Sequence, residues 1–83
     1  MEKQEMKKKA KTLEPILRIG KQGVTDNVIE EIKRHLKKKH LIKIKLLRSF
    51  TENNNKKSCA DEISKKTVSE IIEMKGNTIV LFR

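Results

Sequence analysis

The sequence predicts an α+β fold, a two-layer α/β sandwich in which helices pack on a mixed four-stranded sheet. Apolar residues at helical spacing alternate along the chain with short β-branched or alternating runs, in the order α-β-α-β-α-β-β. The first strand, helix and strand imply a right-handed parallel crossover, and the last two strands imply an antiparallel hairpin. Because 83 residues suffice for only one small domain, we expect residues 1–83 to form a single unit.

The first helix is expected over residues 4–13, within a basic N-terminal segment, residues 1–13, that can fray at its start. The apolar residues that recur at helical spacing in it are Met6, Ala10 and Leu13. Pro15 ends this helix, because the residue before a proline disfavours the helical backbone conformation. The β-branched run Ile16–Ile19 then predicts a short strand.

The second helix is expected over residues 26–39, directly after the loop Gly20-Lys21-Gln22-Gly23. Thr25 fits the N-cap position, and Asp26 in the first turn suits the positive end of the helix dipole. One side of the helix is apolar and carries Val28, Ile29, Ile32 and Leu36. The opposite side is polar and carries Asp26, Glu30, Arg34, Lys37 and Lys38.

The clearest strand is Leu41–Arg48, which places Ile42, Ile44 and Leu46 on one face and Lys43 and Lys45 on the other. We expect a polar loop over Ser49–Lys57 and a third helix that starts with a capping box at Ser58. The inward-facing residues of that helix are expected to be Cys59, Ile63 and Thr67.

The chain is predicted to close with a β-hairpin, whose strands are Ile71–Lys75 and Thr78–Arg83. Gly76-Asn77 between them suits a two-residue type II′ turn. The run Ile79–Phe82 is apolar on both faces, which indicates an interior strand with some cover on each side of the sheet.

Positive charge is concentrated in one part of the chain. Lys and Arg number 21 against 11 Asp and Glu, for a formal net charge of +10. Residues 33–45 hold seven of these cations and no acid, and residues 1–12 hold five lysines and two glutamates. Such an excess favours a polyanion as the partner. General lysine enrichment of solvated surfaces is the alternative interpretation, although it leaves the neutral C-terminal third unexplained.

Several classes of protein lack support in the sequence. There is no apolar stretch near the roughly 18 residues of a membrane span, and no signal-peptide pattern. A single cysteine, Cys59, excludes an internal disulfide, so we expect a cytoplasmic protein without a membrane partner. The only aromatic residues are Phe50 and Phe82, which predicts contact with nucleic-acid backbone more than base stacking. Phe50 either stacks on a base or anchors its loop, and the anchor is favoured.

The loop Gly20–Gly23 is the strongest local candidate for a contact. Its glycines let another backbone approach closely, and the helix behind it offers free N–H groups to a phosphate. Lys21 adds a charge. A βα turn that merely needs flexible residues is the alternative, and the loop lacks the pattern of a nucleotide-hydrolysing P-loop.

Three segments resemble the YhbY family, also called the CRM domain, in the family's order. Leu13–Thr25 resembles the family's start, His40–Lys45 its "ELIKVK" strand, and Gly76–Arg83 its closing "GxTLVLYR" hairpin. The resemblance covers roughly residues 4–83 and implies a fold similar to the C-terminal domain of translation initiation factor three. It also implies RNA binding, since stand-alone bacterial and archaeal members are associated with precursors of the large ribosomal subunit. Val68-Ser69 departs from the family, which often has glycine there.

Together these observations predict a non-enzymatic RNA-binding protein that binds ribosomal RNA and assists assembly of the large subunit. The expected RNA-contact residues are Gly20, Lys21, Gln22, Gly23, Arg18, Arg34, Lys37, Lys38, Lys43 and Lys45. We expect a monomer with no cofactor, no metal and no small-molecule substrate. One alternative is a protein-interaction module that uses its sheet surface. The other, an RNA hydrolase, has the least support because no metal or acid–base cluster is visible.

Overall fold

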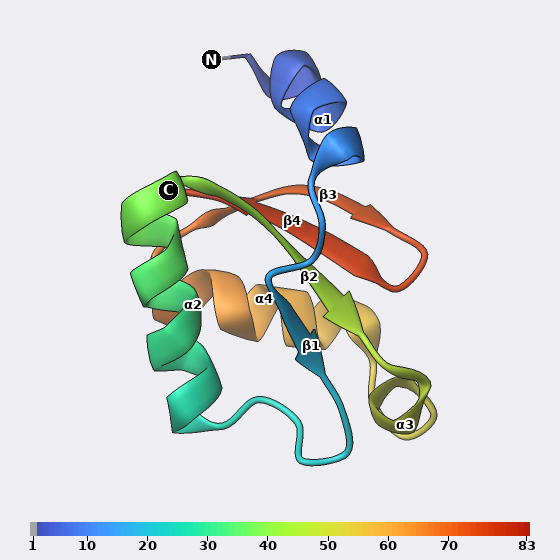
Figure 1. The fold of residues 1–83 in the computed structure, drawn as a ribbon. Coiled ribbons are helices and arrows are strands. Elements are labelled where there is room, and N and C mark those ends of the chain that lie inside the picture. The colour runs from blue at the N-terminus through green and yellow to red at the C-terminus, as the bar shows by residue number, and fades with distance from the viewer. Residues whose placement is uncertain (1) are drawn as a thin grey trace.

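The structure, a computed structural model, describes residues 2–83 (Figure 1). Its elements are α1 (Lys3–Thr12), β1 (Leu17–Ile19), α2 (Asp26–Lys39), β2 (Leu41–Leu46), α3 (Arg48–Thr51), α4 (Lys56–Thr67), β3 (Glu70–Lys75) and β4 (Thr78–Phe82). The predicted α+β class with a mixed four-stranded sheet is confirmed. Met1, the first residue of the predicted basic segment, lies outside the described residues.

The strands form one sheet in the order β1-β2-β4-β3. β1 runs parallel to β2, while β4 pairs antiparallel with both β2 and β3. The predicted parallel pairing of the first two strands, the hairpin and the interior position of the last strand are therefore confirmed. In the hairpin, Gly76 has a φ of 58° whereas Asn77 has no positive φ, the combination of a type II′ turn.

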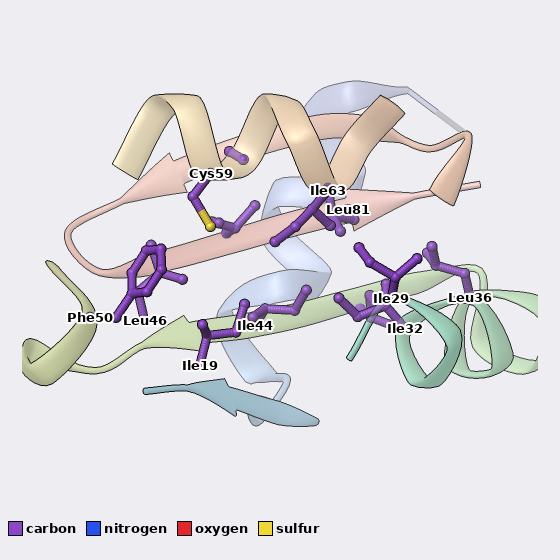
Figure 2. Packing of buried hydrophobic residues seen from close by; sticks show 13 residues of the cluster. Ile19, Ile29, Ile32, Leu36, Ile44, Leu46, Phe50, Cys59, Ile63 and Leu81 are labelled. Atoms are coloured by element: carbon purple, nitrogen blue, oxygen red, sulfur yellow. The ribbon is translucent and has the colours of Figure 1, made fainter. Parts of the chain in front are cut away.

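Helices cover the two faces of the sheet unequally. α2 and α4 pack on one face over the main apolar cluster, in which Ile44, Ile63 and Leu81 are fully buried (Figure 2). α1 lies across part of the other face, where Met6 and Ala10 join a second, smaller cluster from β3 and β4. Apolar side chains on both faces of β4 are thus explained, since each face meets a different cluster.

The segment between β2 and α4 differs from the prediction. β2 ends at Leu46 instead of Arg48, and the short helix α3 lies where a loop and no helix was expected. The reason is Phe50, which is only 5% exposed and packs beside Leu46 and Cys59 at one end of the main cluster (Figure 2). Phe50 therefore anchors this segment, as favoured above.

The start of α4 also differs. The helix begins at Lys56, and its N-cap is Asn55, whose side-chain oxygen accepts a hydrogen bond from the Ser58 N–H at 3.0 Å. The predicted capping box at Ser58 is wrong, because Ser58 already lies inside the first turn. By contrast, α2 spans the predicted residues, and Thr25 caps it by accepting from the Val28 N–H at 3.2 Å.

No helix in residues 2–83 combines the length and the apolar character that crossing a membrane requires.

Candidate nucleic-acid interface

The loop Gly20–Gly23 joins β1 to α2 at one end of the molecule (Figure 1). The Gly23 N–H donates to the Gly20 carbonyl at 2.9 Å, which closes a tight turn and leaves Lys21 and Gln22 exposed at its tip. Gly23 has a φ of 73°, in the left-handed region that favours glycine. The turn thus presents two polar side chains and the adjoining backbone to solvent.

The protein's own packing restricts Gly20, whereas Gly23 is favoured by its left-handed φ. A Cβ on Gly20 would lie 3.3 Å from Cδ1 of Leu47, and a Cβ on Gly23 would lie 3.5 Å from the ring of Phe50. The loop is held against the segment that leads into α3. Close approach of an RNA backbone is therefore not the only reason for glycine here, and Lys21 and Gln22 are the cleaner positions to test.

The N-terminus of α2 contributes N–H groups next to the loop. Thr25 satisfies the N–H of Val28, and Asp26 places a carboxylate in the first turn. A phosphate gains from the helix dipole but is repelled by Asp26. The most favourable place for an anion is therefore toward the loop tip, beside Lys21, and away from the axis of the helix.

Three exposed cations lie in one row across the sheet, on the face opposite α2 and α4. Arg18 on β1 is the register partner of Lys45 on β2, Lys45 faces Thr78 on β4, and Thr78 faces Lys75 on β3. We call Arg18, Lys45 and Lys75 the basic row. Adjacent strands are separated by about 4.8 Å, so the row crosses about 14 Å. It starts two residues before Gly20, and α1 leaves all three side chains exposed.

Lys43 lies on the same face of the sheet but nearer to α1. It is half-buried and lines a shallow hollow with Lys11, Lys75 and Glu73. Because Glu73 offsets part of the positive charge, Lys43 is a weaker candidate for a phosphate contact than Lys45. Sequence reasoning missed Lys75, since only the strand order brings it to this face, and the packing of α1 on the sheet brings Lys11 there.

The remaining predicted cations lie on the exposed side of α2, which runs away from the loop. Arg34 lies near the middle of α2, and Lys37 and Lys38 lie in its last turn. At 1.5 Å per residue, Lys37 is about 16 Å along the axis from the start of the helix. The structure therefore does not bring the far-end pair, Lys37 and Lys38, together with the loop (Figure 1).

The predicted cations have no ion-pair partners in residues 2–83. The ion pairs found there join residues three or four apart in the sequence, namely Lys33–Glu30, Arg48–Glu52 and Lys66–Glu62. Exposed pairs of this kind contribute little to stability. None of the predicted RNA-contact residues takes part, so their charges are available to an external anion.

The one cysteine of the sequence, Cys59, is buried in the main apolar cluster. Cys59 is 4% exposed, and burial, with a smaller effect of the nearby Glu62 carboxylate, raises the pKa of its thiol to about 11. A thiol in this state is almost entirely protonated at neutral pH. In the described part of the chain, no three His, Cys, Asp or Glu side chains are grouped so as to hold a metal ion.

A mixed sheet with a Gly-x-x-Gly loop leading into its packed helix, and with a basic row beside that loop, defines a small, basic α+β domain. The chain belongs to the CRS1 / YhbY (CRM) domain family, whose profile matches residues 1–83. The family resemblance of the three segments is thereby confirmed.

Relatives from bacteria and archaea align with nearly the whole chain. "Probable RNA-binding protein YqeI" of Bacillus subtilis is 37% identical over 82 residues, which are 99% of this chain and 83% of that protein. A protein of Methanocaldococcus jannaschii, also named a probable RNA-binding protein, is 35% identical over 98% of this chain and 60% of its own length. A solution structure from Staphylococcus aureus, described as "a putative RNA binding protein", has a TM-score of 0.79 at 35% identity. That match covers 98% of this chain and 82% of the other.

Proposed function

We propose that this protein binds RNA through the loop Gly20–Gly23 and the basic row beside it. The observation that carries the proposal is that the basic row adjoins the loop. Its exposed cations have no ion-pair partner within residues 2–83, begin two residues before the loop and extend across the sheet. Membership of a family whose relatives are named probable RNA-binding proteins identifies RNA as the polyanion.

In the proposed mechanism, one phosphate lies at the loop tip beside Lys21, and the neighbouring phosphates follow the basic row. Arg18 can hold a phosphate with two parallel hydrogen bonds, whereas Lys45 and Lys75 act as point charges. The contacts are to the backbone, so this part of the interface recognises the shape and charge of RNA without reading its sequence.

We further propose that residues 1–83 act as one non-catalytic unit on ribosomal RNA during assembly of the large subunit. The family resemblance supports this role. The alternative of an apolar interaction module has less support, because Val68 is the one strongly exposed large apolar side chain in residues 2–83. Cosedimentation with precursor and mature large subunits tests the proposal, and crosslinking followed by sequencing identifies the RNA.

A pair of single substitutions tests the location of the contact. Lys21→Glu reverses an exposed charge at the loop tip, and Lys38→Glu makes the same change in the far-end pair. We expect Lys21→Glu to weaken binding to RNA about tenfold, or about 1.4 kcal/mol, and Lys38→Glu to leave it nearly unchanged. Circular dichroism checks that both variants fold. Equal effects of the two substitutions would refute the proposed location.

A further inference from the structure

A hollow lies between the loop Gly20–Gly23 and the segment that joins α3 to α4. Lys21, Gln22 and Gly23 line it from the loop, and Asn54, Asn55 and Ser58 line it from the opposite side. We call it the asparagine pocket. The family resemblance covers the loop side of the pocket but not the run of three asparagines, residues 53–55, on its other side. The pocket measures about 290 Å³, near the lower end of the roughly 300–1,000 Å³ of small-ligand sites. A single ring system suits this volume better than a larger ligand.

The two asparagine side chains in the pocket are held in fixed orientations by the backbone. The Asn54 amide donates to the Phe50 carbonyl at 2.8 Å, and because a carbonyl only accepts, the donating atom is Nδ2. The Asn55 side chain accepts from the Ser58 N–H at 3.0 Å, so the accepting atom is Oδ1. Oδ1 of Asn54 and Nδ2 of Asn55 have no hydrogen-bond partner within residues 2–83. Two residues that line the pocket therefore each keep one free amide atom, an acceptor on Asn54 and a donor on Asn55.

The charges around the pocket favour a neutral group inside it. Lys21 lines the pocket from the loop and Glu62 lines it from α4, so the lining carries one positive and one negative side chain, and Glu62 also pairs with Lys66 at 3.0 Å. A phosphate inside the pocket would meet the Glu62 carboxylate, but a phosphate at the loop tip would meet Lys21. A neutral, planar group with a donor and an acceptor on one edge fits the interior, and every nucleobase has such an edge.

We propose that the asparagine pocket receives one unpaired nucleobase of the bound RNA while the adjoining loop holds its phosphate. This inference rests on the proposed function and adds base recognition to it. A base inside the pocket must be unstacked, so the protein selects single-stranded segments, bulges or loops over continuous duplex. Phe50, which also lines the pocket and is buried, supplies apolar contact without the exposed ring that stacking needs.

Oligonucleotides with and without bases separate this inference from backbone binding. The wild-type protein is titrated with an unstructured ten-nucleotide RNA and with the same sugar–phosphate chain carrying abasic residues. One well-held base adds about 1–3 kcal/mol of discrimination. We expect the base-containing RNA to bind about tenfold more tightly than the abasic chain.

Matched asparagine substitutions then locate the effect. Asn55→Ser removes the free Nδ2 donor but keeps a neutral N-cap oxygen for the Ser58 N–H. Asn53→Ser makes the same change at an exposed neighbour that does not line the pocket. We expect Asn55→Ser to reduce the tenfold preference to about threefold or less without changing the affinity for the abasic chain. Asn53→Ser is expected to keep the full preference.

Each possible result decides between the two proposals. If the wild type binds both oligonucleotides equally, the pocket inference is overturned and the proposed RNA binding stands. If the wild type binds neither, both are overturned. Full preference in Asn55→Ser, or equal loss in Asn53→Ser, also overturns the inference. If Asn55→Ser fails to fold, the NMR signal of the Asn55 side-chain amide in the wild type decides. It must shift with the base-containing RNA and not with the abasic chain.

Discussion

Removing two charges from the basic row should halve the salt dependence of RNA binding. The proposed interface holds four phosphates, at Lys21 and the three cations of the basic row. Each phosphate neutralised on a single strand contributes about −0.7 to the slope of log K against log salt, so the wild-type slope is about −3. The double variant Arg18→Gln, Lys45→Gln leaves two contacts and a slope of about −1.4.

These slopes translate into a measurable loss of affinity. Between 50 and 200 mM salt, the wild-type affinity should fall about 50-fold, whereas that of the double variant should fall about sevenfold. Fluorescence anisotropy with a labelled single-stranded RNA at four or five salt concentrations measures both slopes.

The far-end pair provides a matched control for this experiment. Lys37→Gln, Lys38→Gln also removes two exposed charges from the same net charge of +10, but at the opposite end of α2. This variant should keep the wild-type slope. If both double variants reduce the slope by the same amount, RNA responds to total charge, and the reasoning from the position of the basic row is refuted.

Three further predictions concern stability. Val68→Gly should raise the free energy of unfolding by about 1 kcal/mol in urea denaturation, because Val68 is 71% exposed and holds a left-handed φ of 52° at the end of α4. Thr25→Ala should lower it by about 1 kcal/mol through loss of the α2 cap, which the same denaturation measures. Burial raises the Cys59 pKa from 9.0 to about 11, so the unfolded chain loses this proton first as pH rises. Denaturation at pH 8 to 11.5 should therefore show the wild type losing about 2–3 kcal/mol relative to Cys59→Ala above pH 9. Parallel pH curves for these two proteins would contradict the account, as would a lower urea midpoint for Val68→Gly or an unchanged one for Thr25→Ala.

Elements specified by local chemistry could be predicted from the sequence. Thr25 before a periodic apolar run sets the start of α2, and Gly76 before Asn77 sets the hairpin turn. α3 was missed because a helix of four residues is too short to show helical periodicity in the sequence. The packing of Phe50 in the main apolar cluster holds this helix in place, and that contact cannot be read from the local sequence. The start of α4 was misplaced because Asn55 and Ser58 are equally good N-cap residues.

The arrangement of charge could be predicted only in part. The block of cations over residues 33–45 suggests one patch. In the structure, the cations over residues 33–39 lie on α2, which runs away from the loop, whereas Lys45 lies near the end of β2, beside the loop. Lys75 joins the basic row only because β4 lies between β2 and β3, a pairing between distant segments. The loop Gly20–Gly23 was recognisable, whereas the close approach of Leu47 to Gly20 was not, since the two residues are remote in sequence.

The central claim is that RNA binds at the loop end of the domain. NMR titration of the labelled protein with an unstructured RNA tests it most directly, because every backbone amide reports its own environment. The account predicts that the largest shifts fall on residues 18–24, Lys45, Asn55 and Lys75, with small shifts over residues 37–40. Largest shifts over residues 37–40, with residues 18–24 unmoved, would contradict it.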